Sequence, residues 1–241
     1  MTEAVILRDL SGMAEFLQAE ALQRTVWGQD DSPDPADLMM VIQAEGGLCA
    51  GAFREGRLLG YIFGFPTSDR GVQHSHRLAV LPEARGLGLG VRLKWYQRDW
   101  CLRHAITLVR WTFDPARLPN ASLNIGNLGA TACTYCPDYY GTMAGLNAGA
   151  PSDRLLVDWH LSGPSAVARA AGLGWAPDPA RITGHVALPA DFGLLLRDDP
   201  DQALRERLRI RSALQEAFAR GEEIAGFNRA AGAYTLARRV D

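Results

Sequence analysis

Cysteine is scarce in this chain, with four residues among 241. Small secreted proteins that depend on disulfides carry a denser set, so we expect no disulfide framework. Long apolar runs are also missing, since no stretch approaches the roughly 20 apolar residues that a membrane-spanning helix requires. The N-terminal sequence MTEAVILRDL carries charges where a secretory signal needs an apolar run. We therefore expect a cytoplasmic protein that does not bind membranes.

A large net charge of one sign is missing too. The chain has 25 basic and 27 acidic residues, for a formal net charge of −2. Proteins that bind nucleic acid usually concentrate positive charge, so this balance argues against a nucleic-acid partner. The apolar content is 47%, which suffices for a sizeable core over this length.

Strand and helix patterns alternate along the first two thirds of the chain. The pattern around Glu55-Gly56-Arg57 predicts a hairpin, because two apolar runs flank a short polar turn. An α/β fold follows from the expected elements. We expect strands near 5–7, 48–54, 58–65, 73–81, 106–113, 131–135 and 155–161, and helices from 11, over 36–45, for about 15 residues after the glycine-rich loop, and within 120–130.

The C-terminal third has a different rhythm. Residues 162–165 are small and turn-forming, so they are a candidate boundary. Asp199-Pro200 predicts a helix start, and strands are expected at 182–188, 224–228 and 234–237. We predict a core over residues 1–161 and a βαββ extension over residues 166–241 that packs on it. The expected apolar face of the extension's helix comprises Leu204, Leu208, Leu214 and Phe218.

The most informative segment runs from Leu78 to Gly90, where a strand enters a glycine-rich loop that opens a helix. Gly86, Gly88 and Gly90 alternate with other residues. Such glycines let successive backbone N–H groups turn toward one point, and the helix N-terminus adds free donors and partial positive charge. Arg85, Arg92 and Lys94 are expected to add cationic charge. A pyrophosphate fits this loop.

Two common phosphate motifs do not fit the segment. The chain lacks the string G-x-x-x-x-G-K-[ST] of the P-loop. In the dinucleotide motif G-x-G-x-x-G, the third glycine would fall on Val91 or Leu93. The pattern that fits is Arg-x-x-Gly-x-Gly, with Arg85, Gly88 and Gly90.

This segment resembles motif A of the GNAT superfamily of acyl-CoA-dependent N-acyltransferases. The order of elements over residues 1–161 is similar as well. The strings HSH at 74–76, WTFDP at 111–115 and LNIGNLGA at 123–130 look like a bacterial GNAT subgroup, with a narrower similarity to N-succinyltransferases of amino acids. The resemblance implies a mixed, mostly antiparallel central sheet flanked by helices.

The resemblance also implies how the chain binds an acyl-CoA. The backbone of Leu78, Ala79 and Val80 would pair with the pantetheine amides, in the gap between the motif-A strand and the next one. The N–H of Val80 would polarise the thioester carbonyl. Asn120 and Asn124 would contact coenzyme A or the acceptor, although they could equally cap helix ends. The pyrophosphate site would comprise Arg85, Gly86, Leu87, Gly88, Leu89, Gly90 and Val91.

The sequence offers few candidates for the residues that transfer protons. His76 is expected on one strand face with His74, Leu78 and Val80, where it could serve as a base or as a hydrogen-bonded structural residue. Many GNAT enzymes carry a tyrosine before an L-G-F-like turn, and here that position is Ile125. Tyr135, Tyr139 or Tyr140 could substitute as the proton donor, or could simply pack.

Two hypotheses follow. The first is an N-acyltransferase that moves an acetyl or succinyl group from acyl-CoA to a small amine, such as an amino acid, by direct attack on the thioester. The second is an acyl-CoA-binding sensor that has lost catalysis. Neither needs a metal, so Cys133-x-x-Cys136 is interpreted as two incidental thiols. The extension is expected to shape the acceptor pocket or a homodimer contact.

Overall fold

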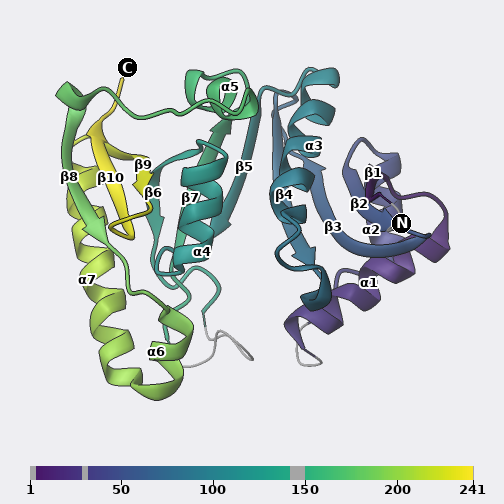
Figure 1. Cartoon of the computed structure of the whole chain (residues 1–241), viewed down its shortest axis with the longest axis horizontal. Coiled ribbons are helices and arrows are strands. Elements are labelled where there is room, and N and C mark those ends of the chain that lie inside the picture. Colours follow the sequence, from purple (N-terminus) through teal and green to yellow (C-terminus); the bar gives the residue numbers. More distant parts are fainter. Residues whose placement is uncertain (1–3, 29–31, 142–149, 241) are drawn as a thin grey trace. The chain divides into compact units, whose positions relative to one another are not determined.

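The computed structural model describes residues 4–28, 32–141 and 150–240 (Figure 1). The chain divides into two compact units, Met1–Val109 and Arg110–Asp241. The sequence predicts a solvated acidic loop at residues 30–37, DDSPDPAD, and its residues 30 and 31 lie outside the described residues. None of the described helices combines the length and the apolar character that crossing a bilayer requires.

The first unit is a four-stranded antiparallel sheet in the order β1-β2-β3-β4, with three helices. The predicted hairpin joins β2 to β3. Glu55 and Gly56 have φ angles of 51° and 75°, which suits a tight turn whose two central residues both have positive φ. The elements are β1 (Ile6–Asp9), α1 (Met13–Trp27), α2 (Ala36–Ala44), β2 (Leu48–Arg54), β3 (Arg57–Pro66), β4 (Val72–Val80), the 3₁₀-helix η1 (Pro82–Ala84) and α3 (Leu89–Arg103).

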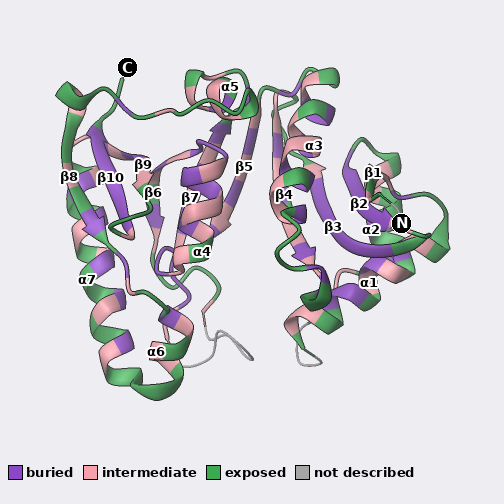
Figure 2. Cartoon of the chain, viewed as in Figure 1, coloured by how far each residue is buried: buried purple, intermediate pink, exposed green. Residues whose placement is uncertain are grey.

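The core of this unit forms where β3 meets the helices. Seven consecutive residues of β3, from Leu58 to Gly64, are buried, as expected for a strand covered on both faces (Figure 2). The predicted face of α3 is confirmed at Leu89, Leu93 and Trp100, which are all buried. Tyr96 lies on the same face and donates a hydrogen bond from its hydroxyl to Asp9 Oδ1 at 2.8 Å.

The second unit carries strands in the order β5-β7-β6-β9-β10-β8. The antiparallel pair β6–β9 joins Ala132 to Ile224, so the predicted extension continues the sheet of the preceding segment. The elements are β5 (Leu108–Phe113), α4 (Leu118–Ala121), the π-helix η2 (Ser122–Asn127), β6 (Thr131–Cys136), β7 (Arg154–His160), α5 (Pro164–Ala170), the 3₁₀-helix η4 (Pro179–Arg181), β8 (Ile182–Ala187), α6 (Phe192–Asp198), α7 (Pro200–Ala219), β9 (Glu222–Asn228) and β10 (Ala233–Arg238).

Helix α7 begins where the sequence predicts, because the side chain of Asp199 accepts a hydrogen bond from the N–H of Gln202 at 2.9 Å. Its predicted apolar face is wrong in part. Leu204 and Leu208 are 39% and 45% exposed. The buried face comprises Ala203, Arg207, Ile210, Leu214 and Ala217, spaced by four and three residues.

Two further differences concern helices. The turn-rich segment at 162–165 is the start of α5, and α6 was not expected. Both are only seven residues long, too short for a periodic apolar pattern. The helix expected within 120–130 is present as α4 followed by the π-helix η2. The predicted mixed α/β class with a mostly antiparallel sheet is confirmed.

Candidate functional site

The glycine-rich segment between β4 and α3 presents a row of free backbone donors. Gly86 and Gly88 have φ angles of 84° and 68°, which residues with a Cβ rarely adopt. Within the described part of the chain, none of the backbone N–H groups of residues 86–91 donates a hydrogen bond. The first N–H of α3 that does so belongs to Arg92, which reaches the carbonyl of Gly88 at 3.0 Å. Free N–H groups at the start of a 15-residue helix attract an anion.

The space over this loop is open. A Cβ added at Gly86 or Gly88 would meet no heavy atom within 4 Å, and one at Gly90 would meet only Leu78 Cδ2, at 3.8 Å. Packing within the protein therefore gives no reason for glycine at position 90. A ligand that approaches the backbone closely does give one. Arg85 and Arg92 lie exposed beside the loop, as the sequence predicts.

Lys94 does not belong to this basic rim, contrary to expectation. Its side chain points into the first unit and is 2% exposed. The amine Nζ donates to Ser75 Oγ at 2.8 Å and to Gln97 Oε1 at 3.1 Å. Burial disfavours the charged amine and lowers the pKa of Lys94 to about 7.

Strand β4 leads into the loop and contains a bulge at His76. Phe63 of β3 lies opposite Arg77, and Gly64 lies opposite Ser75, so His76 has no partner residue on β3. The strict alternation that would place His74, His76, Leu78 and Val80 on one face is interrupted at this point. Beyond the bulge, the N–H of Leu81 donates to the carbonyl of Leu59 at 2.8 Å. Because N–H directions alternate along a strand, those of Leu78 and Val80 point away from β3, whereas that of Ala79 points toward it.

The bulge brings His76 to Asp34, which lies in the expected loop at residues 30–37. His76 Nε2 lies 3.2 Å from Asp34 Oδ1. Asp34 Oδ2 lies 3.2 Å from Arg77 Nε. The backbone of Asp34 is held in turn by the buried side chain of Gln23, whose Oε1 accepts from the Asp34 N–H at 2.8 Å. A histidine 37% exposed at its side chain and oriented by a carboxylate has the arrangement of a general base.

Tyr135 is placed differently from an accessible proton donor. Its side chain is 9% exposed, and its hydroxyl donates to Asp153 Oδ2 at 2.6 Å. Asp153 is fully buried and also accepts two hydrogen bonds from Arg211, at 2.9 Å and 2.6 Å. Burial, followed by the hydrogen bond to Asp153, raises the pKa of Tyr135 well above its ordinary value. This arrangement makes Tyr135 a weaker acid.

Tyr140 is the more accessible of the two tyrosines. It is 55% exposed, and its hydroxyl lies 3.3 Å from Thr112 Oγ1. The guanidinium of Arg154 lies 5.0 Å from the centre of its ring. Tyr139, which is also exposed, packs edge-on against it. The geometry therefore leaves the Tyr140 hydroxyl close to solvent.

The segment α4–η2 carries the two candidate asparagines. Asn124 lies in the π-helix and is 5% exposed, whereas Asn120 is half-buried in α4. Ile125, at the position of the family tyrosine, is buried. π-Helices are rare and often occur at functional sites.

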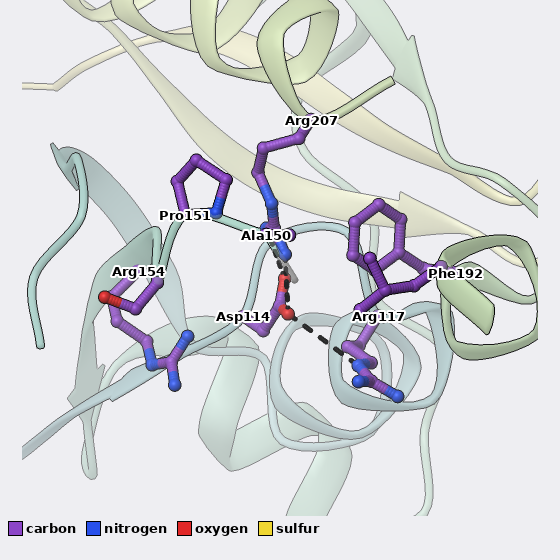
Figure 3. Close-up of a pocket in the computed structure, with 9 residues that line it drawn as sticks. Asp114, Arg117, Ala150, Pro151, Arg154, Phe192 and Arg207 are labelled. Carbon is purple, nitrogen blue, oxygen red and sulfur yellow. Dashed lines mark hydrogen bonds and ion pairs between the residues drawn. The ribbon is translucent and has the colours of Figure 1, made fainter. Parts of the chain in front are cut away.

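A small cavity in the second unit was not expected from the sequence. It has a volume of about 10 Å³, and Asp114, Arg117, Arg154 and Arg207 line it together with Phe192 (Figure 3). Arg207 Nη1 and Nη2 donate to the two oxygens of Asp114 at 2.5 Å and 2.8 Å. Arg117 Nε lies 3.7 Å from Asp114 Oδ2. No group of three or more potential metal ligands occurs in the part of the chain that the structure describes.

Comparison with known proteins points in one direction. Residues 13–123 match the model of the acetyltransferase (GNAT) family. No curated protein matches the sequence.

Solved structures share the fold. The ribosomal-protein-S18-alanine N-acetyltransferase of Escherichia coli is 16% identical with a TM-score of 0.55, over 66% of this chain and 96% of that one. The structure of yncA from Salmonella typhimurium, which contains acetyl-CoA, is 17% identical with a TM-score of 0.54, over 73% and 99%. The aminoglycoside 6'-N-acetyltransferase of Enterococcus faecium is 14% identical with a TM-score of 0.52, over 66% and 98%. At these identities the likeness concerns the fold.

Proposed function

Because the chain belongs to the GNAT acetyltransferase family, we propose that it transfers an acetyl or succinyl group from acyl-CoA to a small amine, with an amino acid as one candidate acceptor. The free N–H groups of residues 86–91 carry this proposal. Six backbone donors at a helix N-terminus, beside glycines that leave the approach open, match a pyrophosphate in charge and in hydrogen-bonding capacity.

The backbone of β4 suits the rest of the co-substrate. The N–H groups of Leu78 and Val80 point away from β3, so this edge of β4 can pair with the pantetheine amides. We assign the Val80 N–H to the thioester oxygen, where it would stabilise the negative charge that develops as the amine attacks. Asn124, a buried polar residue of the π-helix, is a further candidate contact for coenzyme A.

His76 is proposed to accept the proton of the attacking ammonium. The new C–N bond forms while the C–S bond breaks, and the thiolate that leaves needs a proton. Asp34 fixes the imidazole through Nε2, which leaves Nδ1 to accept the proton. Tyr140 is the preferred donor to the thiolate, since its hydroxyl is accessible, whereas that of Tyr135 is engaged with Asp153.

A second candidate function is an acyl-CoA sensor without catalysis. One observation favours it: the buried Ile125 occupies the position of the family tyrosine and cannot donate a proton. The two candidates differ in turnover, because both would bind acyl-CoA.

A thiol-release assay separates them. Acetyl-CoA and succinyl-CoA are each offered with a panel of amino acids and polyamines. Release that depends on one amine supports the transferase. Binding of coenzyme A without release from any pair contradicts it and supports the sensor.

The loop is tested by Gly90→Val. Since a Cβ at Gly90 meets only Leu78 Cδ2, the melting temperature should change little while the affinity for coenzyme A falls. Gly174→Val is the matched control, because a Cβ there meets no heavy atom within 4 Å. Equal affinity in the wild type and in Gly90→Val would remove the loop from the binding site.

A further inference from the structure

We propose that the second unit binds an organic carboxylate at the cavity lined by Arg117, Arg154 and Arg207, here called the arginine cavity. This site lies entirely within residues 114–207. It is distinct from the glycine-rich loop at residues 86–91, and it does not depend on which acyl group or amine the enzyme uses.

The first observation is a buried donor that the protein leaves unused. Arg207 is 2% exposed, and its two terminal nitrogens are both committed to Asp114. Its Nε is buried and has no hydrogen-bond partner among the described residues. An orphaned guanidinium N–H is costly, and a ligand oxygen in the cavity that Arg207 lines would satisfy it.

The second observation concerns the charged side chains that line the cavity. Among the described residues, three guanidiniums and one carboxylate, that of Asp114, line the cavity. Asp191 lies near Arg117, but it caps α6 by accepting a hydrogen bond from the N–H of Leu194 at 3.0 Å. Among the described residues that line the cavity, arginine side chains therefore outnumber carboxylates, which suits an anionic ligand.

The environment of Arg154 disfavours its positive charge. Its Nη1 donates to the backbone carbonyl of Asp153 at 2.9 Å, and its guanidinium lies over the ring of Tyr140. Burial lowers the pKa of Arg154 from its ordinary value, and the nearby charges of Arg207 and Arg117 contribute in the same direction. A bound anion would offset both the lost hydration and the repulsion between like charges.

The shape of the site selects the kind of anion. A cavity of about 10 Å³ holds roughly one water-sized atom, so a single oxygen can enter. A planar carboxylate can place one oxygen there and keep the second at the mouth, facing the flat fork of an arginine. Pro151, Phe192 and Leu196 also line the cavity and can contact a carbon skeleton. Inorganic phosphate has no such apolar part.

Calorimetric titration of the full-length protein with acetate and succinate, in a phosphate-free buffer, tests the proposal. We expect saturable binding of at least one carboxylate and none of acetamide, its neutral analogue. Arg154→Gln should weaken binding about tenfold or more, since it removes a charge-assisted hydrogen bond. Arg154→Lys, which keeps the charge but loses the fork, should fall between the two.

Controls separate this site from the loop and from misfolding. Arg197→Gln is the matched control, because that arginine of α6 is 69% exposed at its side chain and should leave binding unchanged. Gly90→Val should also bind carboxylates as the wild type does. If Arg154→Gln has a lowered melting temperature, Arg117→Gln takes its place in the titration. It is expected to show the same loss of affinity for the carboxylate. The proposal would be overturned if no carboxylate bound saturably to the wild type. It would also be overturned if Arg154→Gln and Arg117→Gln bound carboxylates as tightly as the wild type.

Discussion

The guanidinium of Arg207 in α7 and the carboxylate of Asp114 after β5 form a two-hydrogen-bond ion pair inside the second unit, although 93 residues separate them along the chain. Arg211, one turn further along α7, makes a similar pair with Asp153. Both pairs join the predicted extension to the segment before it. They explain why α7 turns a charged residue, rather than Leu204 or Leu208, toward the interior.

Asp114→Asn should destabilise the protein by about 3–5 kcal/mol, because it leaves the guanidinium of Arg207 buried without its counter-charge. The double variant Asp114→Asn/Arg207→Met should lose less than the sum of the two single losses. Urea denaturation of the four proteins measures this coupling. Additive losses would mean that the pair contributes no interaction energy.

Removal of residues 166–241 should leave a chain that does not fold. The deletion takes away Arg207 and Arg211 of α7, which pair with Asp114 and Asp153, and the strand β9 that pairs with β6. Circular dichroism and thermal melting of the fragment check this expectation, with a chain lacking only residues 240 and 241 as the control. A cooperative melt of the 1–165 fragment would contradict it and would make the extension a separable part.

His76→Gln should lower kcat by about 10²- to 10⁴-fold, the usual range for loss of a general base, while the KM for acyl-CoA stays unchanged. Asp34→Asn should have a smaller effect, since it leaves the imidazole in place but less well oriented. His185→Gln is the control, because His185 is exposed on β8. Steady-state kinetics at several pH values would assign His76 a structural role if kcat and its pH profile were unaltered.

Lys94 makes stability depend on pH in a defined direction. Its pKa is about 7 in the fold, below the ordinary value of 10.5, so between these values the unfolded chain binds more protons than the folded one. Stability therefore rises with pH across this window. The difference in unfolding free energy between the wild type and Lys94→Met should shift in favour of the wild type by about 2 kcal/mol from pH 7 to pH 9. Chemical denaturation at both pH values measures it; a constant difference would mean that Lys94 keeps an ordinary pKa.

Local signals explain what the sequence could predict. The hairpin at Glu55-Gly56 and the glycine-rich loop at Gly86 and Gly88 depend on backbone conformations that neighbouring residues specify, and both occur where expected. The start of α7 is equally local, since Asp199 caps the helix that it precedes. The strand order β1-β2-β3-β4 follows from short connections between successive strands.

Features that depend on distant contacts were not predictable. The sequence around Asp34 indicates only a loop. In the fold, the bulge in β4 brings His76 and Arg77 to Asp34, although they lie 42 and 43 positions later in the chain. From the sequence Lys94 is expected to be a surface cation, because its acceptor Ser75 on β4 comes within reach only when α3 packs on β4. Arg207 is buried in α7 because it pairs with Asp114, which lies 93 positions earlier in the chain. In each case a polar side chain is buried by a partner that no local pattern indicates.

The position of β10 has a consequence for how the protein folds during its synthesis. This strand ends at Arg238 and lies between β9 and β8, while β9 in turn covers β6. The sheet of the second unit therefore cannot close until the chain up to Arg238 has left the ribosome. During synthesis β6 and β7 wait with an exposed edge, a state in which nascent chains aggregate or recruit chaperones. A stop codon after residue 231 would remove all of β10, an interior strand of this sheet.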